Sequence, residues 1–388
     1  MNFACQILRE KKLRRVMRLK ILAIHRKTKR KTRPKINPKI HNACLKSRIE
    51  ILLQFPPTFL PTIFARLSDF VRWRFYATLR INMSISNNQF HARYMPQNPI
   101  ATLGAKTTAK PFVKWAGGKA GVLDSLIPFV PQDFGDYYEP FVGGGALFFA
   151  LQSKGIFKAN AKSKHIILSD KNTELINTYK AIQASPSEVL AELESLQENH
   201  SKEAFYKIRN LDRSPDFASL SNVFRAARFI YLNKTCFNGL CRYNAKGEFN
   251  TPMGSYKNPK IYDKDLIANA HSALQDVEIV SADFAKACEN AQSGDFVYFD
   301  PPYFPLNKTS SFVSYTDNFL ETEQVRLCET FKILESRGVK VLQSNSNTEF
   351  IRKLYKDFEL IEVKARRAIN CKGDKRGEVS ELLIKGRY

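Results

Sequence analysis

The sequence predicts an α/β fold with a parallel β-sheet and crossover helices, and three observations from residue 111 onward support it. Short apolar segments alternate with segments of helical periodicity, which is the pattern of consecutive β-α units. Several apolar segments stop at glycine, aspartate or proline, residues that end strands and begin loops. Between these units, residues 235–262 lack a helical period and are rich in Asn, Gly, Tyr and Lys, which is typical of an inserted loop and hairpin.

The first half of this body contains two expected strands. Residues 136–142 form an apolar strand that runs into three glycines, and residues 165–168 form a second strand that ends at Ser169 and Asp170. The apolar spacing predicts helices over 146–153, 174–182, 188–197 (with Ser187 as N-cap), 202–210 and 218–232.

The second half continues the alternation. Residues 296–299 form a strand of the buried type, which Asp300 and two prolines stop. An amphipathic helix is expected over 321–336, with Gly338 just beyond its end. The last expected elements are a strand over 339–342 and a closing hairpin pair over 359–365 and 379–384.

The positive charge of the chain is concentrated in a basic leader, residues 1–108. The chain has 61 Lys+Arg and 37 Asp+Glu, a formal net charge of +24, whereas the body behind the leader is nearly neutral. Three interpretations of the leader stay open: a nucleic-acid-binding arm, an Arg-rich targeting peptide, or a segment outside the functional protein. We favour the third, with a start at Met83 or Met95, and expect the leader to be disordered or absent.

Composition excludes several classes of protein. A hydrophobic content of 44% is too high for a disordered chain. The most apolar stretches, 51–64 and 141–151, are too short or too interrupted to cross a bilayer, so we expect no membrane partner. Seven cysteines in 388 residues do not indicate a disulfide framework, and we expect a reduced, cytoplasmic protein.

The most informative motif is Asp300-Pro301-Pro302-Tyr303. The prolines fix the backbone and donate no hydrogen bond, so nearby carbonyl oxygens stay available as acceptors. A carboxylate and a proline carbonyl can accept both hydrogens of an amino group while the tyrosine ring stacks on a base. Because these acceptors localise the nitrogen lone pair, the motif suits methylation of an exocyclic amine. The alternative is a structural Asp-Pro turn with a packed tyrosine.

A strand, glycine turn and helix start over 139–145 would let a ligand approach the backbone closely. The dinucleotide fingerprint would require glycine where Phe148 stands, and no P-loop is present, so a nucleoside without pyrophosphate fits best. Asp170, at the end of the next strand, is placed to bind ribose hydroxyls. The turn over 112–119 is either a second binding turn or a solvated lysine pair beside a core tryptophan.

Residues 233–256 interleave amides, basic side chains and aromatics with turn glycines. This composition can read base edges and wedge between bases, although a polar surface loop has it too. Cys236 and Cys241 have no second Cys/His pair at metal spacing, so we expect no metal.

These segments resemble the Dam/DpnM-type (alpha-group) family of DNA adenine-N6 methyltransferases, in particular its GATC-specific restriction-modification branch. The matching segments are FVKWAGGK (112–119), EPFVGGGALFF (139–149), LSDKNTELI (168–176), FNGLCRYNAKGEFNTPMGSYKNPK (237–260) and DFVYFDPPYFPL (295–306). The resemblance implies a class I S-adenosylmethionine-dependent (Rossmann-like) methyltransferase sheet. Its catalytic domain would be residues 109–184 and 264–388, and a helical and β-hairpin target-recognition insertion would be 185–263.

The resemblance also implies roles for individual residues. The target adenine would be held by Asp300, Pro301, Pro302 and Tyr303. S-adenosylmethionine would be contacted by Trp115, Lys119, Glu139, Gly143, Gly145, Asp170, Asp283 and Asp300. DNA would be contacted by Lys114, Phe237, Asn238, Leu240, Arg242 and Pro252. Two positions depart from the family pattern: Phe237 stands where tyrosine is common, and Ser255 stands where arginine is common.

The implied activity is methyl transfer from S-adenosylmethionine to adenine N6 in double-stranded GATC sites, without a metal, in a bacterial nucleoid-associated enzyme. Its functional partner would be a cognate GATC restriction endonuclease. A non-catalytic or regulatory DNA-binding protein derived from this fold is one alternative, and it would have a broken cofactor site. An RNA methyltransferase is another, and it would not need the insertion.

We expect a variant that lacks residues 1–94 to keep most of the methylation activity of the full chain, because the leader contains none of these motifs. Initial rates of both proteins on the same DNA check this. A large loss of rate on truncation would show that the leader belongs to the functional protein.

Overall fold

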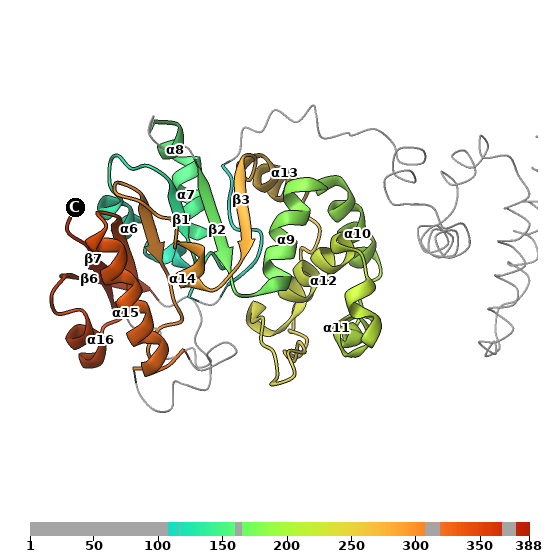
Figure 1. The fold of residues 1–388 in the computed structure, drawn as a ribbon. Helices are drawn as coiled ribbons and strands as arrows, with labels where there is room; N and C mark the ends of the chain where they lie inside the picture. Colours follow the sequence, from blue (N-terminus) through green and yellow to red (C-terminus); the bar gives the residue numbers. More distant parts are fainter. Residues whose placement is uncertain (1–107, 116, 160–164, 307–318, 367–377) are drawn as a thin grey trace, which may run out of the picture. The chain divides into compact units, whose positions relative to one another are not determined.

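The computed structural model describes residues 108–115, 117–159, 165–306, 319–366 and 378–388, so residues 1–107 of the basic leader lie outside the described residues. The described residues form a seven-stranded sheet in the order β3-β2-β1-β4-β5-β7-β6, in which β7 is antiparallel to both of its neighbours (Figure 1). The strands are β1 Tyr137–Glu139, β2 Ile166–Asp170, β3 Val277–Ser281, β4 Phe296–Phe299, β5 Lys340–Ser346, β6 Glu359–Arg366 and β7 Glu378–Lys385.

Parallel pairing aligns the carboxyl ends of the first four strands. Tyr137 of β1 is opposite Ile166 of β2 and Phe296 of β4, and β2 pairs with β3 in the same direction. Order along the sheet reverses between β1 and β4, since the chain moves outward through β2 and β3 and then returns. Ligands of open α/β sheets bind at such a reversal, outside the carboxyl ends of the strands.

Helices cover both faces of the sheet. Side chains alternate across a strand, so Tyr137 belongs to the core on one face and Tyr138 to the core on the other. Buried residues of the first core come from α6 Leu123–Leu126, α7 Ala146–Ser153, α8 Ile156–Ala159, α9 Thr173–Ala184 and α13 Lys264–Ala273. Those of the second come from α14 Phe284–Ala287, α15 Glu321–Ser336 and α16 Glu349–Leu354.

The connection from β2 to β3 carries the inserted elements. These are α10 Pro186–Glu198, α11 Lys202–Arg209 and α12 Asn222–Thr235, together with the 3₁₀ turns η5 Asn210–Arg213, η6 Pro215–Ser219 and η7 Phe237–Gly239. Figure 1 shows α10 to α12 gathered with α9 near the β3 edge of the sheet. Two further 3₁₀ turns, η3 Lys119–Gly121 and η4 Ile127–Phe129, flank α6.

The loop-and-hairpin character predicted for 235–262 is confirmed. Two isolated antiparallel bridges, Cys236↔Met253 and Tyr243↔Phe249, fold this segment back on itself. We call residues 242–250, which the second bridge closes, the recognition hairpin.

Several predicted boundaries are wrong for local reasons. The N-cap of α10 is Ser185, not Ser187, because Pro186 with its fixed φ begins the helix. The helix predicted from 218 starts at Asn222, since the Ser221 side chain accepts a 3.1 Å hydrogen bond from the Phe224 amide and caps it there. The strand predicted over 136–142 ends at Glu139, before Pro140, and β5 runs on to Ser346.

Candidate active site

Three acidic side chains lie at the carboxyl ends of adjacent parallel strands. Glu139 ends β1, Asp170 ends β2, and Asp300 directly follows β4. Asp283, after β3, lies at the same edge of the sheet. The predicted catalytic and cofactor residues therefore come together from segments that are far apart in the sequence.

Asp300 is paired with a buried lysine. Lys119 Nζ is 2.6 Å from Asp300 Oδ1 and donates a 2.8 Å hydrogen bond to the carbonyl of Gly117. The Lys119 side chain is 3% exposed and that of Asp300 is 21% exposed. Burial raises the pKa of Asp300 to about 6, although the Lys119 ammonium opposes the shift.

The same ammonium lies over the ring of Tyr303, with Nζ 4.6 Å from the ring centroid. The Tyr303 hydroxyl donates a 2.8 Å hydrogen bond to Glu381 Oε2 on β7. The Lys119 ammonium thus lies between the Asp300 carboxylate and the Tyr303 ring, and both groups attract a cation.

Two fully buried amides fix the backbone on either side of Tyr303. Gln324 of α15 donates from Nε2 to the carbonyl of Pro302 at 3.0 Å, and Asn345 Oδ1 of β5 accepts from the amide of Phe304 at 3.2 Å. Asn345 Nδ2 also donates to Gln324 Oε1 at 2.9 Å. Sequence reasoning missed both amides and Glu381, because nothing in the local sequence marks them as neighbours of Tyr303.

Asp170 holds the glycine turn. Its carboxylate accepts from the amides of Gly143 (3.1 Å) and Asn172 (2.9 Å). Burial raises the pKa of Asp170 to about 6, and these amides oppose the shift. Gly143 has φ +47°, and a Cβ atom there would lie 2.5 Å from Cδ1 of the Trp115 indole. The turn therefore needs glycine at this position for the close approach of Trp115.

Glu139 is buried beside this turn. Its Oε2 accepts a 2.8 Å hydrogen bond from the Tyr137 hydroxyl. The pKa of Glu139 is raised to about 8, chiefly by burial; the Tyr137 hydroxyl opposes the shift and the negative charge of Asp300 adds to it. A cation bound beside this carboxyl group would favour its ionised form.

Asp283, which follows β3, is held by Arg326 of α15. Nη1 and Nη2 of Arg326 lie 2.8 and 2.7 Å from its two oxygens, and the amide of Ala285 donates at 3.1 Å. The Arg326 hydrogen bonds lower the pKa of Asp283. The Arg326 guanidinium lies 4.0 Å from the centroid of the Phe284 ring. Asp283 is thus ionised and fixed at the acidic edge.

The residues predicted to contact DNA form a second cluster around Asn233. This buried side chain accepts from the Lys114 amide at 2.8 Å and donates to the carbonyls of Lys114 (2.7 Å) and Gly239 (3.0 Å). It therefore ties the 112–119 segment to the insertion. Sequence reasoning did not assign a role to Asn233, and its proximity to Lys114 is visible only in the fold.

The loop beyond Asn233 presents the other predicted contacts. Phe237 is 45% exposed at the turn, its amide donates to the carbonyl of Pro252 at 2.9 Å, and Asn238 has φ +55°. Arg242 is exposed, and its Nε donates to Asn250 Oδ1 at 2.8 Å. Leu240 accepts at its carbonyl from the Thr251 hydroxyl at 2.6 Å. All six predicted DNA-contact residues thus belong to one connected region.

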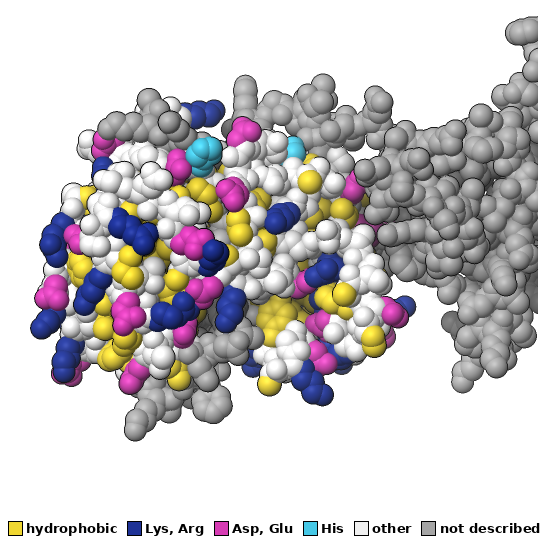
Figure 2. Space-filling view, in the orientation of Figure 1, with side chains coloured by type: hydrophobic (Ala, Val, Ile, Leu, Met, Phe, Trp, Pro, Cys, Tyr) yellow, Lys and Arg dark blue, Asp and Glu magenta, His cyan; other side chains and the backbone are white. Residues whose placement is uncertain are grey.

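Charges of both signs are mixed on the described surface that Figure 2 shows. Basic and acidic side chains alternate over that face, which agrees with the nearly neutral body. No helix in the described part of the chain combines the length and apolar character needed to cross a membrane.

The sheet order, the antiparallel seventh strand and the acidic edge define a class I methyltransferase. The family model described as D12 class N6 adenine-specific DNA methyltransferase matches residues 115–369. The chain belongs to this family, and it is an adenine-specific DNA methyltransferase that acts on DNA with S-adenosylmethionine as methyl donor.

Similar proteins with named activities support the assignment to this methyltransferase family. The chain is 43% identical to the type II methyltransferase M1.LlaDCHI of Lactococcus lactis subsp. cremoris, covering 72% of this chain and 96% of that one. It is 45% identical to the type II methyltransferase M.MjaIII of Methanocaldococcus jannaschii, covering 71% and 98%. It is 37% identical to a DNA adenine methylase of Vibrio cholerae, covering 70% and 94%.

We expect Gly143→Ala to weaken S-adenosylmethionine binding at least tenfold, because the added methyl group would displace Trp115 from the turn. Gly155→Ala is the matched control: Gly155 has φ +71°, and no atom lies within 4 Å of an added Cβ. Both variants carry backbone strain of about 1 kcal/mol. Isothermal titration of S-adenosylmethionine measures the difference, and equal affinities of the two variants would contradict a role of the turn in binding.

Proposed function

We propose that the enzyme methylates N6 of an adenine turned out of double-stranded DNA within GATC, with Asp300, Pro301 and Tyr303 holding the base. The supporting observation is the position of Lys119 Nζ, which is hydrogen-bonded to Asp300 and lies over the Tyr303 ring. The amino group of a base stacked against Tyr303 needs hydrogen-bond acceptors, and the Asp300 carboxylate is one of them. The Asp300 carboxylate and the face of the Tyr303 ring therefore favour a nitrogen donor at this point of the pocket.

Asp300 and Pro301 act as paired hydrogen-bond acceptors. A carboxylate oxygen and the Pro301 carbonyl accept the two N6 hydrogens, which localises the nitrogen lone pair away from the ring. Asp300 has a second oxygen, so Lys119 can stay paired with Oδ1 once its ammonium leaves the face of the Tyr303 ring to the base. After transfer, the carboxylate of Asp300 can take the proton that N6 must lose. No step needs a metal ion or a covalent bond to the enzyme.

The stacking surface is fixed before the base arrives. Glu381 holds the Tyr303 hydroxyl, while Gln324 and Asn345 hold the adjoining backbone. Turning a base out of the duplex costs a few kcal/mol, so a preformed surface limits the additional ordering cost. Pro302 contributes through its carbonyl and through its restricted φ.

The acidic edge fits S-adenosylmethionine, which supplies the methyl group from a sulfonium when it is bound. Its sulfonium and ammonium are cationic, and Glu139, Asp170 and Asp300 provide carboxylates against one buried lysine, Lys119. Asp170 lies where ribose hydroxyls bind in this sheet class. We assign Trp115, Lys119, Glu139, Gly143, Gly145, Asp170, Asp283 and Asp300 to this site.

The loop beyond Asn233 reads the target sequence. Phe237 wedges into the duplex beside Asn238, where its ring retains a stacking face without a hydroxyl. Arg242 can bind a guanine edge with two nitrogens, the commonest specific contact in the major groove. The contacts with DNA are completed by Lys114, Leu240 and Pro252. Ser255, at a position where arginine is common, has no charge with which to bind a phosphate.

We also infer a restriction-modification role, with a GATC restriction endonuclease as functional partner on the nucleoid. Two relatives are named type II methyltransferases, at 43% and 45% identity, against 37% for the DNA adenine methylase of Vibrio cholerae. A non-catalytic DNA-binding protein is disfavoured, because the acidic edge and its lysine are intact.

We expect the purified enzyme to make unmethylated plasmid DNA resistant to a nuclease that GATC adenine methylation blocks. Asp300→Ala is expected to lower the rate by at least about 10²–10³-fold, the usual effect of removing one transition-state partner. Single-molecule sequencing of the product reports the modified base and its sequence directly. Modification at another sequence would refute GATC specificity, and near-normal activity of Asp300→Ala would refute the catalytic assignment.

We expect the methylation rate to fall as the pH decreases through about 6, because Asp300 must be ionised to accept the amine hydrogens and its pKa is raised to about 6. Lys119→Met should move this midpoint to higher pH, since the cation that favours the carboxylate is removed while Glu381 continues to disfavour it. Rates measured from pH 5 to 9 test this, with Lys154→Met, at an exposed lysine, as control. An unshifted midpoint in Lys119→Met would contradict the role of the pair.

A further inference from the structure

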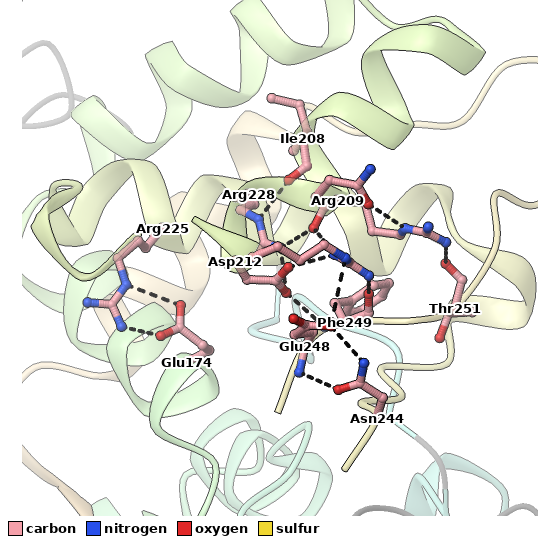
Figure 3. Close-up of polar contacts among 12 residues, drawn as sticks. Glu174, Ile208, Arg209, Asp212, Arg225, Arg228, Asn244, Glu248, Phe249 and Thr251 are labelled. Atoms are coloured by element: carbon pink, nitrogen blue, oxygen red, sulfur yellow. Dashed lines mark hydrogen bonds and ion pairs between the residues drawn. The ribbon is translucent and has the colours of Figure 1, made fainter. Parts of the chain in front are cut away.

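We infer that Asp212 and Arg228 are positioning residues for sequence discrimination, because together they anchor the recognition hairpin that carries Arg242. This inference rests on the proposed function of Arg242 as a base-reading residue. Neither Asp212 nor Arg228 belongs to the active site or to the residues assigned to DNA contact. The inference depends on a continuous chain of contacts from α12 to the guanidinium of Arg242, and Figure 3 shows its first part, from Arg228 through Asp212 to Phe249.

Arg228 is a buried cation on α12 whose Nε and Nη2 atoms bind groups of the protein. Its side chain is 3% exposed. Nε donates to the carbonyl of Ile208 at 2.9 Å, and Nη2 donates to the carbonyl of Arg209 at 2.7 Å. Nη2 is also 2.8 Å from Asp212 Oδ2. The guanidinium therefore joins α12 to the end of α11 and to η5.

Asp212 extends this contact to the recognition hairpin. Its side chain is 8% exposed, and Oδ2 accepts a 2.8 Å hydrogen bond from the amide of Phe249. The neighbouring Arg213 donates from Nη2 to the carbonyl of Phe249 at 3.0 Å and from Nη1 to Asp212 Oδ1 at 2.8 Å. Both polar backbone atoms of one hairpin residue are thus bound by two consecutive residues of η5.

Phe249 determines where Arg242 lies. Phe249 forms the bridge with Tyr243, and the next residue, Asn250, donates from its amide to the carbonyl of Arg242 at 2.9 Å. Asn250 Oδ1 also accepts from Arg242 Nε at 2.8 Å. A displacement of Phe249 would therefore move the backbone and the guanidinium of Arg242 together.

An isolated two-stranded hairpin is only marginally stable in water, so this one needs support from the rest of the fold. Productive contacts generally require placement within about 0.5 Å, which a surface loop without an anchor does not provide. A buried ion pair whose partners are all satisfied is rigid, because every alternative position leaves a charge without a partner. Asp212 and Arg228 supply this rigidity at a distance from the DNA.

A second ion pair on the same helix offers a matched control. Arg225 pairs with Glu174 of α9, and Figure 3 shows this pair beside the Asp212 network with no drawn contact to it. Arg225 also contacts the ring of Phe217, but it has no hydrogen bond with a residue of the recognition hairpin among the described contacts. Removing it tests the general effect of losing an ion pair from α12.

The test compares methylation rates on duplexes that carry the preferred site or a single base-pair change in it. We expect Asp212→Asn to lower the discrimination ratio at one or more positions about tenfold, with a smaller loss of rate at the preferred site. Arg225→Gln is expected to discriminate as the wild type does. Unchanged discrimination in folded Asp212→Asn would overturn the inference, and so would an equal loss in Arg225→Gln.

A second variant keeps the test decisive if Asp212→Asn does not fold. The double variant Asp212→Leu/Arg228→Met removes both charges, and apolar replacements of a buried pair often preserve folding. It should remain folded, bind S-adenosylmethionine and lose discrimination; wild-type discrimination in this variant would refute the inference.

Hydrogen exchange of the wild-type chain tests the anchor without relying on activity. The Phe249 amide is expected to exchange as slowly as buried amides of α12, and much more slowly than that of the exposed turn residue Ala245. Fast exchange at Phe249 would overturn the anchor even if the enzyme methylates DNA as proposed. Slow exchange in a chain that does not methylate adenine would instead point to failure of the proposed function.

Discussion

The ion pair between Lys119 and Asp300 is the interaction on which the arrangement of the active site depends. The sheet brings several carboxyl groups to one edge, and their mutual repulsion would favour protonated, neutral forms. Lys119 supplies a buried cation that keeps Asp300 available as a carboxylate, and its backbone belongs to the segment that also carries Trp115 and Lys114. One side chain therefore connects the proposed cofactor turn, the acceptor for the amine and the stacking ring of Tyr303.

Buried polar groups with all their partners inside the protein fix both functional regions. Around Tyr303, the Gln324 and Asn345 amides bind each other and the backbone on both sides of the ring. In the insertion, Asn233 ties Lys114 to the loop, while the Asp212–Arg228 pair supports the recognition hairpin. Since a buried polar group without a partner is costly, each network permits one backbone position. This rigidity matches a reaction in which positioning supplies most of the catalysis.

The sequence predicted the α/β class and most helices well and element boundaries less well, while the roles of the candidate site residues stay predictions. The motif from Asp300 to Tyr303 carries its chemistry in adjacent residues, and the glycine turn is recognisable because φ values near +47° and +70° select glycine at 143 and 145. Boundaries were missed where local chemistry competed with the apolar spacing: Pro186 begins α10, and the Ser221 side chain caps α12. Strand β3 and helix α13 were not predicted, although both contribute buried residues to the first core.

The sequence by itself determined the kinds of side chain available for chemistry: paired acceptors beside an aromatic ring, a glycine turn, an acidic residue after the next strand, and a loop rich in amides and basic residues. Only the tertiary structure decided which distant residues support them. Glu381 binds the Tyr303 hydroxyl, while Gln324 and Asn345 bind the backbone on either side of it, from three separate elements. Asp212 reaches the recognition hairpin across a gap of 37 residues. Local propensity acts over a few residues, whereas these contacts arise from sheet order and helix packing, which bring together chain segments without any shared sequence pattern.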